Sequence, residues 1–308
     1  MKNQIIFLSL LLGISFAFFS CKTEEKSEVL NSKESALIEN YKPIIFPKDS
    51  TQLWLSEGNI KSDTVFIVAE GGPHNQLDFE WGGQTVWSRL PDFFQYYRIH
   101  ILQSTMLNKD IYHWKNEFTE EMARKELDNS TEILARAIDY WKAREKTVIV
   151  AGTSFGAFLI PHYIATRGNK ADKYIMSAGR LNAHPDQFKY HLLGYNSRFE
   201  EDGKTLMIPD TTRGPNPFRG EYYFKLSKVK QLIKGVLGEY RFTEELKDTD
   251  LSNLIVGYAT NDVQVGALNE KELEFLKSKN AQVYATDDGH AGVDRKLISL
   301  IAEGTIKL

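Results

Sequence analysis

The stretch VIVAGTSFGAF, residues 148–158, places an apolar, β-branched run directly before a serine that stands between two glycines. The run predicts a buried strand, and the residues after Gly156 predict a helix. A Gly-x-Ser-x-Gly sequence at such a junction is typical of a strained turn that lifts the serine hydroxyl above a sheet. Glycine suits both flanking positions if neighbouring backbone comes too close for a Cβ atom. Ser154 is therefore the candidate nucleophile, and a helix-capping serine in a plain turn is the alternative.

Composition places the chain among globular proteins that act on small molecules. Its 308 residues are 42% hydrophobic and 12% aromatic, enough for one large α/β domain or two small ones. The net charge of -3 and the pI near 6.2 provide no basic excess. A nucleic-acid partner therefore has no electrostatic support, and we expect none.

The N-terminus is expected to be a targeting segment. Lys2 precedes an apolar stretch, residues 5–19, that is shorter than the roughly 20 residues of a membrane-spanning helix. The stretch ends at Phe-Phe-Ser-Cys, which resembles the lipobox of bacterial lipoproteins, where the cysteine carries the lipid. Cys21 is the only cysteine, so no intramolecular disulfide can form. We expect a signal peptide over 1–20, a lipid on Cys21, and an extracytoplasmic protein anchored to a bacterial membrane. An ordinary cleaved signal and an uncleaved anchor are the alternatives.

Domain organisation follows from composition and hydrophobic pattern. Residues 21–43 are polar and charged, which predicts a solvated tether. An acidic pair, Glu24-Glu25, resembles the surface-export signal of some Gram-negative lipoproteins and favours the outer membrane surface. The folded core is expected over 44–182 and 248–308. A lid insertion is expected over 183–247, where the alternation of strand and helix breaks down.

The core alternates strand-like and helix-like segments, which predicts an α/β fold with a mostly parallel sheet flanked by helices. One long helix is expected over 119–144 and a final helix over 293–303. The predicted strands are 64–69, 98–102, 147–151, 253–258 and 282–285, with 174–177 as a sixth candidate.

A serine hydroxyl is a weak nucleophile at neutral pH, so it needs a base within hydrogen-bond reach and an acid that orients the base. His290 lies in a glycine-flanked loop between the last predicted strand and the final helix. Asp262 follows the strand before it. Asp287 and Asp288 are local alternatives, although residues two or three positions from His290 have difficulty reaching its far ring nitrogen.

The order Ser154, Asp262, His290, each residue following a strand, resembles the α/β-hydrolase superfamily from residue 64 to the C-terminus. The resemblance implies a nucleophilic Ser154, a general base and acid in His290, and an orienting carboxylate in Asp262. It also implies an oxyanion hole formed by the backbone N–H of Phe155 and that of Gly72, with Gly71 behind it. This chemistry requires no metal or cofactor, and none is expected.

The oxyanion loop VAEGGPHN, residues 68–75, also resembles the His-Gly-Gly-Pro-Gly signature of proline iminopeptidases. Glu70 stands in place of the histidine and His74 in place of the last glycine. The implied activity is cleavage of an ester or amide, through an acyl-enzyme, in a small-molecule or peptide substrate. Two alternatives stay open: an aminopeptidase of the proline iminopeptidase type, and a non-catalytic surface binding lipoprotein on the same fold.

Overall fold

The computed structural model describes residues 42, 44–77, 87, 89–90, 95–108, 111, 117–213 and 220–308. The chain divides into two units, Met1–Pro43 and Ile44–Leu308, and the fold below is that of the second. The expected signal peptide, the lipidation site Cys21 and the tether, apart from Lys42, lie outside the described residues. No helix within the described ranges has the length and apolar character needed to cross a membrane.

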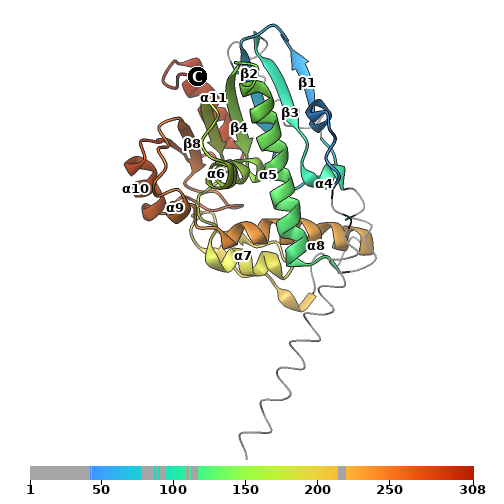
Figure 1. Ribbon diagram of the computed structural model, residues 1–308. Helices are drawn as coiled ribbons and strands as arrows, with labels where there is room; N and C mark the ends of the chain where they lie inside the picture. The colour runs from blue at the N-terminus through green and yellow to red at the C-terminus, as the bar shows by residue number, and fades with distance from the viewer. Residues whose placement is uncertain are drawn as a thin grey trace, which may run out of the picture. The chain divides into compact units, whose positions relative to one another are not determined.

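A seven-stranded sheet in the order β1-β3-β2-β4-β5-β8-β9 forms the centre of this unit (Figure 1). Strand β1 pairs antiparallel with β3, and every other neighbouring pair in this sheet is parallel. A separate short hairpin joins β6 to β7. The strands are β1 Trp54–Gly58, β2 Thr64–Ala69, β3 Tyr97–Ile101, β4 Thr147–Thr153, β5 Lys173–Ser177, β6 Arg198–Phe199, β7 Leu206–Met207, β8 Leu254–Ala259 and β9 Gln282–Thr286.

Helices cover both faces of the sheet. In Figure 1 the helices α5 and α6 lie in front of the central strands, while α11 packs on β5, β8 and β9. The α-helices are α4 Ser104–Leu107, α5 Glu120–Lys142, α6 Phe155–Arg167, α7 Pro185–Leu192, α8 Gly220–Val236, α9 Phe242–Glu245, α10 Glu270–Ser278 and α11 Gly292–Ala302. The 3₁₀ helices are η1 Ser50–Leu53, η4 Thr211–Arg213 and η5 Leu237–Glu239.

Burial on both faces explains why the central strands are continuous apolar runs. Side chains alternate between the faces of a strand, and Phe66, Ile149 and Ile255 point to the side where they form one cluster with Val293 and Leu297 of α11. The alternate residues of the same strands are equally buried and face the layer of α5 and α6. The predicted fold class, α/β with a mostly parallel sheet flanked by helices, is confirmed.

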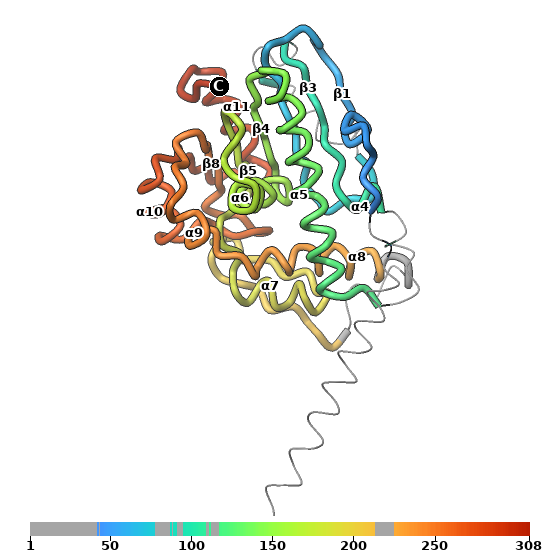
Figure 2. The backbone as a smooth tube through the Cα atoms, viewed as in Figure 1, coloured from blue at the N-terminus to red at the C-terminus, as the bar shows by residue number. Residues whose placement is uncertain are grey.

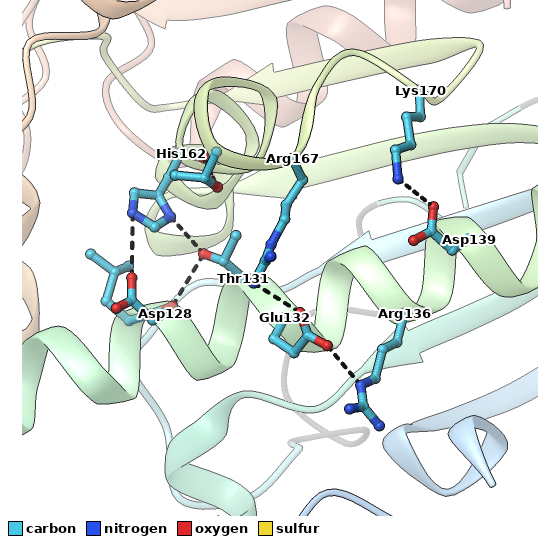
Figure 3. Close-up of polar contacts among 10 residues, drawn as sticks. Asp128, Thr131, Glu132, Arg136, Asp139, His162, Arg167 and Lys170 are labelled. Atoms are coloured by element: carbon cyan, nitrogen blue, oxygen red, sulfur yellow. Dashed lines mark hydrogen bonds and ion pairs between the residues drawn. The ribbon is translucent and has the colours of Figure 1, made fainter. Parts of the chain in front are cut away.

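Polar contacts between α5 and α6 fix the helix that follows Ser154 (Figure 3). The buried His162 ring lies against Thr131, with 2.7 Å between Nδ1 and Oγ1. The Glu132 carboxylate forms ion pairs with Arg136 of its own helix at 2.9 Å and with Arg167 of α6 at 3.0 Å. These contacts fix the orientation of α6 on α5. They therefore also fix the position of the first turn of α6, which follows Ser154.

The segment between β5 and β8, where the lid insertion was expected, forms α7, the β6–β7 hairpin, η4, α8, η5 and α9. Helices α7 and α8 lie side by side, and α8 also packs against α5 (Figure 2). This segment therefore contributes a helical pair next to the N-terminal half of α5.

Candidate active site

Ser154 occupies a strained turn between β4 and α6. Its backbone angles are φ 54° and ψ -115°, an unusual conformation for a residue with a Cβ atom. Such conformations cost on the order of 1–3 kcal/mol and occur mainly where function requires them. The Ser154 side chain makes no capping hydrogen bond to α6, although Ser154 is the N-cap residue. The capping-serine alternative thus has no support, and the hydroxyl is left available for chemistry.

Both glycines of the motif are required by close backbone contacts. A Cβ atom at Gly156 would lie 2.0 Å from the carbonyl oxygen of Ala69, the last residue of β2. A Cβ atom at Gly152 would lie 2.3 Å from the carbonyl oxygen of Gly156. Either contact is far shorter than van der Waals packing allows, so the turn can form only with glycine at these positions.

His290 and Asp262 form the central polar pair of the site. The two side chains meet with 2.7 Å between His290 Nδ1 and Asp262 Oδ2. Asp262 is only 1% exposed, and its other oxygen accepts hydrogen bonds from the backbone N–H of Gln264 at 2.8 Å and of Val265 at 3.1 Å. With Nδ1 donating to this fixed carboxylate, Nε2 keeps its lone pair and can act as a base.

The loop that carries His290 is held by Asn261. The Asn261 side chain accepts a hydrogen bond from Gly289 N–H at 2.9 Å and donates one to the carbonyl oxygen of Asp287 at 2.6 Å. The carboxylates of Asp287 and Asp288, the alternative partners of His290, belong to exposed residues. The structure therefore pairs His290 with Asp262.

Gly71 and Gly72 bring the predicted oxyanion loop to the serine. A Cβ atom built on Gly71 would lie 3.5 Å from the Ser154 Cβ atom, so the backbone at Gly71 passes directly beside the candidate nucleophile. Gly72 has φ +151°, which L side chains rarely adopt. The N–H groups of Gly71, Gly72 and Phe155 have no hydrogen-bond acceptor within the described part of the chain. They are the donors an oxyanion could meet.

Gln103, which the sequence reasoning missed, holds this loop in place. Its amide nitrogen donates to the carbonyl oxygens of Glu70 at 3.1 Å and Gly71 at 2.7 Å, and its amide oxygen accepts from His74 N–H at 2.7 Å. Gln103 is 2% exposed and lies in the turn between β3 and α4. Its position two residues after the buried strand β3 was the only available signal.

The structure does not bring every predicted partner into contact. Ser154 and His290 do not hydrogen bond to each other. In hydrolases such bonds are often long in the free protein and tighten when substrate binds. The structure thus pairs His290 with Asp262 and places the Gly71 backbone beside Ser154.

A cavity of about 190 Å³ opens beside the serine. Its walls come from the start of α6, from α7, β6, α8 and η5, and from three loops. They are formed by Ser154, Phe155, Phe158, Ala183, Gln187, Phe188, His191, Asn196, Arg198, Gln231, Lys234, Leu237, Gln264 and Val265. A wider hollow of about 870 Å³ near Arg180 and Tyr258 does not include Ser154. The smaller cavity is therefore the candidate substrate pocket.

Across the described ranges, no group of three His, Cys, Asp or Glu side chains is placed to hold a metal ion.

Several solved structures are similar to this chain in fold. The chain is similar to a putative non-heme bromoperoxidase from Mycobacterium tuberculosis, with a TM-score of 0.51 and 12% identity over 86% of this chain and 97% of that one. It is also similar to a lipase-esterase related protein from Clostridium acetobutylicum, with a TM-score of 0.49 and 14% identity over 82% and 99%. An α/β hydrolase enzyme from a deep-sea metagenome library has a TM-score of 0.48 and 12% identity over 83% and 94%.

No protein-family model matches the sequence, and no curated protein matches it. The sheet order, the helical layers and the structural similarity together show that the chain has the α/β-hydrolase fold. The resemblance predicted from the sequence is thereby confirmed at the level of the superfamily fold.

Proposed function

We propose that the protein is a serine hydrolase that cleaves an ester or amide through an acyl-enzyme. The observation that supports this best is the 2.7 Å contact between His290 and the buried Asp262 carboxylate. It supplies an oriented base, and the uncapped Ser154 in its strained turn supplies a nucleophile at the wall of a pocket. An oriented base and a serine that the substrate can reach are the two requirements for nucleophilic acyl transfer.

In the proposed reaction, Ser154 Oγ attacks the acyl carbonyl carbon and His290 Nε2 takes the hydroxyl proton. The oxyanion accepts hydrogen bonds from the N–H of Phe155 and of Gly72 or Gly71. The C–O or C–N bond then breaks, and the leaving alcohol or amine receives the proton from His290. A water molecule, deprotonated by His290, then attacks the acyl-enzyme. The acyl–Oγ bond breaks, Ser154 Oγ takes the proton back from His290, and the acid is released. Asp262 stabilises the imidazolium in both halves of the reaction.

The location is proposed from the sequence alone. A lipid on Cys21 would anchor the enzyme outside the cytoplasm, so its substrate would be extracytoplasmic. Metabolic labelling with radioactive palmitate tests this: the wild type should incorporate the label and Cys21→Ser should not. Label in Cys21→Ser, or none in the wild type, would contradict the anchor.

The activity is tested by labelling the full-length protein in detergent with a fluorophosphonate, which reacts with activated serines. We expect the wild type to label, and Ser154→Ala and His290→Ala to lose labelling while keeping the circular dichroism of the wild type. Ser299→Ala, at a solvent-exposed position on α11, is the matched control and should label fully. A folded wild type that neither labels nor hydrolyses any ester or amide would favour the non-catalytic binding protein.

A further inference from the structure

We propose that the pocket beside Ser154 binds an anionic group of the substrate, a carboxylate or a phosphate, through Lys234 and Arg198. This inference rests on the proposed function and names the class of substrate that it acts on. It also concerns a set of residues that the triad and the oxyanion loop do not use.

The pocket wall is positively charged and contains no acid. Lys234 of α8 and Arg198 of β6 both line it, and no Asp or Glu is among its lining residues. Neither cation has a hydrogen bond or ion pair with any other residue in the part of the chain that the structure describes. Lys234 is half-buried, whereas Arg198 is exposed at the rim of the same cavity. Most cations buried to this extent in proteins are paired. The unpaired Lys234, with a second cation beside it, therefore indicates that the counter-charge comes from a ligand.

The surroundings of Lys234 add positive charge. Lys230 lies one helical turn before it on α8 and is itself partly buried. Burial and the positive charges of Lys230 and Arg198 lower the pKa of Lys234 to about 8. On the facing helix α7, burial and the charge of Lys234 lower the pKa of His191 to about 3, so this ring is neutral at pH 7. Lys234 thus remains a cation at neutral pH without a neutralising neighbour.

Two other lining residues have buried polar atoms that need a partner. Gln231 is 6% exposed and His191 is 8% exposed, and Gln231 Oε1 and His191 Nε2 have no hydrogen-bond partner among the described residues. An aliphatic acyl chain would leave both atoms unsatisfied, at a cost in binding free energy. A polar ligand could satisfy them. The pocket therefore favours a charged, polar group over a fatty acyl chain.

Size limits the group further. The cavity, about 190 Å³, is smaller than the roughly 300–1,000 Å³ of sites for drug-sized ligands. Because Ser154 is part of the wall, the anionic group must lie within a few bonds of the scissile bond. The same wall argues against the cationic amino terminus that an aminopeptidase substrate would present.

The test compares charged and neutral esters on the full-length protein in detergent. Phenyl hydrogen succinate and phenyl methyl succinate differ by a charge on the acyl side. Two acetate esters place the negative charge on the leaving group: 4-acetoxybenzoate as a carboxylate and 4-acetoxyphenyl phosphate as a phosphate. Methyl 4-acetoxybenzoate is their neutral counterpart. We expect kcat/KM to favour the charged member of at least one pair by roughly tenfold to a hundredfold, the size of a charge-assisted hydrogen bond.

The variants assign that preference to the pocket. Lys234→Met and Arg198→Gln should each bring the ratio of kcat/KM for the charged ester to kcat/KM for the neutral ester closer to one. Lys228→Met is the matched control, because Lys228 lies on the same helix but pairs with Glu117 at 3.1 Å. Its preference should equal that of the wild type. The preference should also decline above about pH 8, where Lys234 loses its proton.

A binding measurement separates this inference from the proposed function. Succinate and inorganic phosphate, each at constant ionic strength with sodium chloride as reference, should raise the melting temperature of Ser154→Ala and not that of Ser154→Ala with Lys234→Met. Hydrolysis of all the esters with equal charged-to-neutral ratios in the wild type and both pocket variants would overturn the anion site and leave the hydrolase. Anion binding without labelling or turnover would overturn the hydrolase and leave the anion site. Absence of both would overturn both.

Discussion

Thr153 donates a hydrogen bond to Asp294, with 3.0 Å between Oγ1 and Oδ1. This contact joins the residue before Ser154 to a carboxylate one turn after His290, across β4 and α11. Asp294 is 6% exposed, and burial raises the pKa of its carboxyl group above the ordinary value. The contact connects the two segments that carry the proposed nucleophile and base, which suggests that it sets their spacing.

Replacing Thr153 by valine should slow the reaction of Ser154. Valine keeps the shape but cannot donate, so Asp294 loses a partner at a cost of about 1–3 kcal/mol in the free energy of unfolding. We expect the second-order rate of fluorophosphonate labelling to fall about tenfold or more, because the spacing of Ser154 and His290 loosens. Thr166→Val, which removes a bond to the carbonyl oxygen of His162 at the far end of α6, is the control. A loss of stability at an unchanged labelling rate would assign the contact to folding alone.

Asp262→Asn should reduce kcat about 10⁴-fold, as the same change does in other triads. The asparagine oxygen can still accept from Gln264 and Val265, so stability should change little. Its amide group would donate toward His290 Nδ1 and hold the ring in the tautomer that places the proton on Nε2. Kinetics and urea unfolding measure the two effects. Asp288→Asn, at an exposed position in the His290 loop, should retain full activity; if it lost as much, Asp262 would not be the orienting acid.

Most of the sheet was predictable because parallel strands buried on both faces are continuous apolar runs. The prediction 64–69 coincides with β2, and the candidate strand at 174–177 became β5 with one added residue. The antiparallel edge strand β1 was not predicted. Only Trp54 in it is buried, and Leu55 is 46% exposed, so it has neither a continuous apolar run nor regular alternation.

The proposed triad was predictable because Ser154, Asp262 and His290 each follow a strand. The carboxyl ends of parallel strands lie at the same edge of the sheet. The proposed anion site beside Ser154 was not predictable, because Arg198, Gln231 and Lys234 come from the segment between β5 and β8, whose path over the sheet has no sequence signal. Gln103 was missed for another reason. Its importance comes from three bonds to backbone atoms of the 70–74 loop, and a glutamine that binds backbone carries no motif.

Gln103→Leu should therefore lower catalysis through the oxyanion loop. Leucine fills a similar volume but leaves the carbonyls of Glu70 and Gly71 and the N–H of His74 without their partner. We expect kcat to fall by about 10²-fold or more, comparable to the loss of one oxyanion donor, with KM less affected. Gln282→Leu, which removes a side-chain contact with Tyr284 on β9, is the control. If kcat stayed within threefold of the wild type, the loop would not depend on Gln103.

The buried His162 should make the protein sensitive to acid. Burial, with a smaller effect of Arg167, lowers the pKa of His162 to about 4, while in the unfolded chain it titrates near the ordinary value of 6.5. Between these values the unfolded state binds more protons, so the free energy of unfolding should decrease as the pH falls from about 6.5 to about 4.

His162→Gln tests this, because glutamine can still donate to Thr131 but does not titrate in this range. Urea unfolding of both proteins at pH 7, 5.5 and 4.5 should show a weaker pH dependence for the variant than for the wild type. The variant should retain some dependence, because His191, with a pKa of about 3, behaves in the same way. Equal slopes for the two proteins would mean that His162 takes up its proton in the folded state as readily as in the unfolded one.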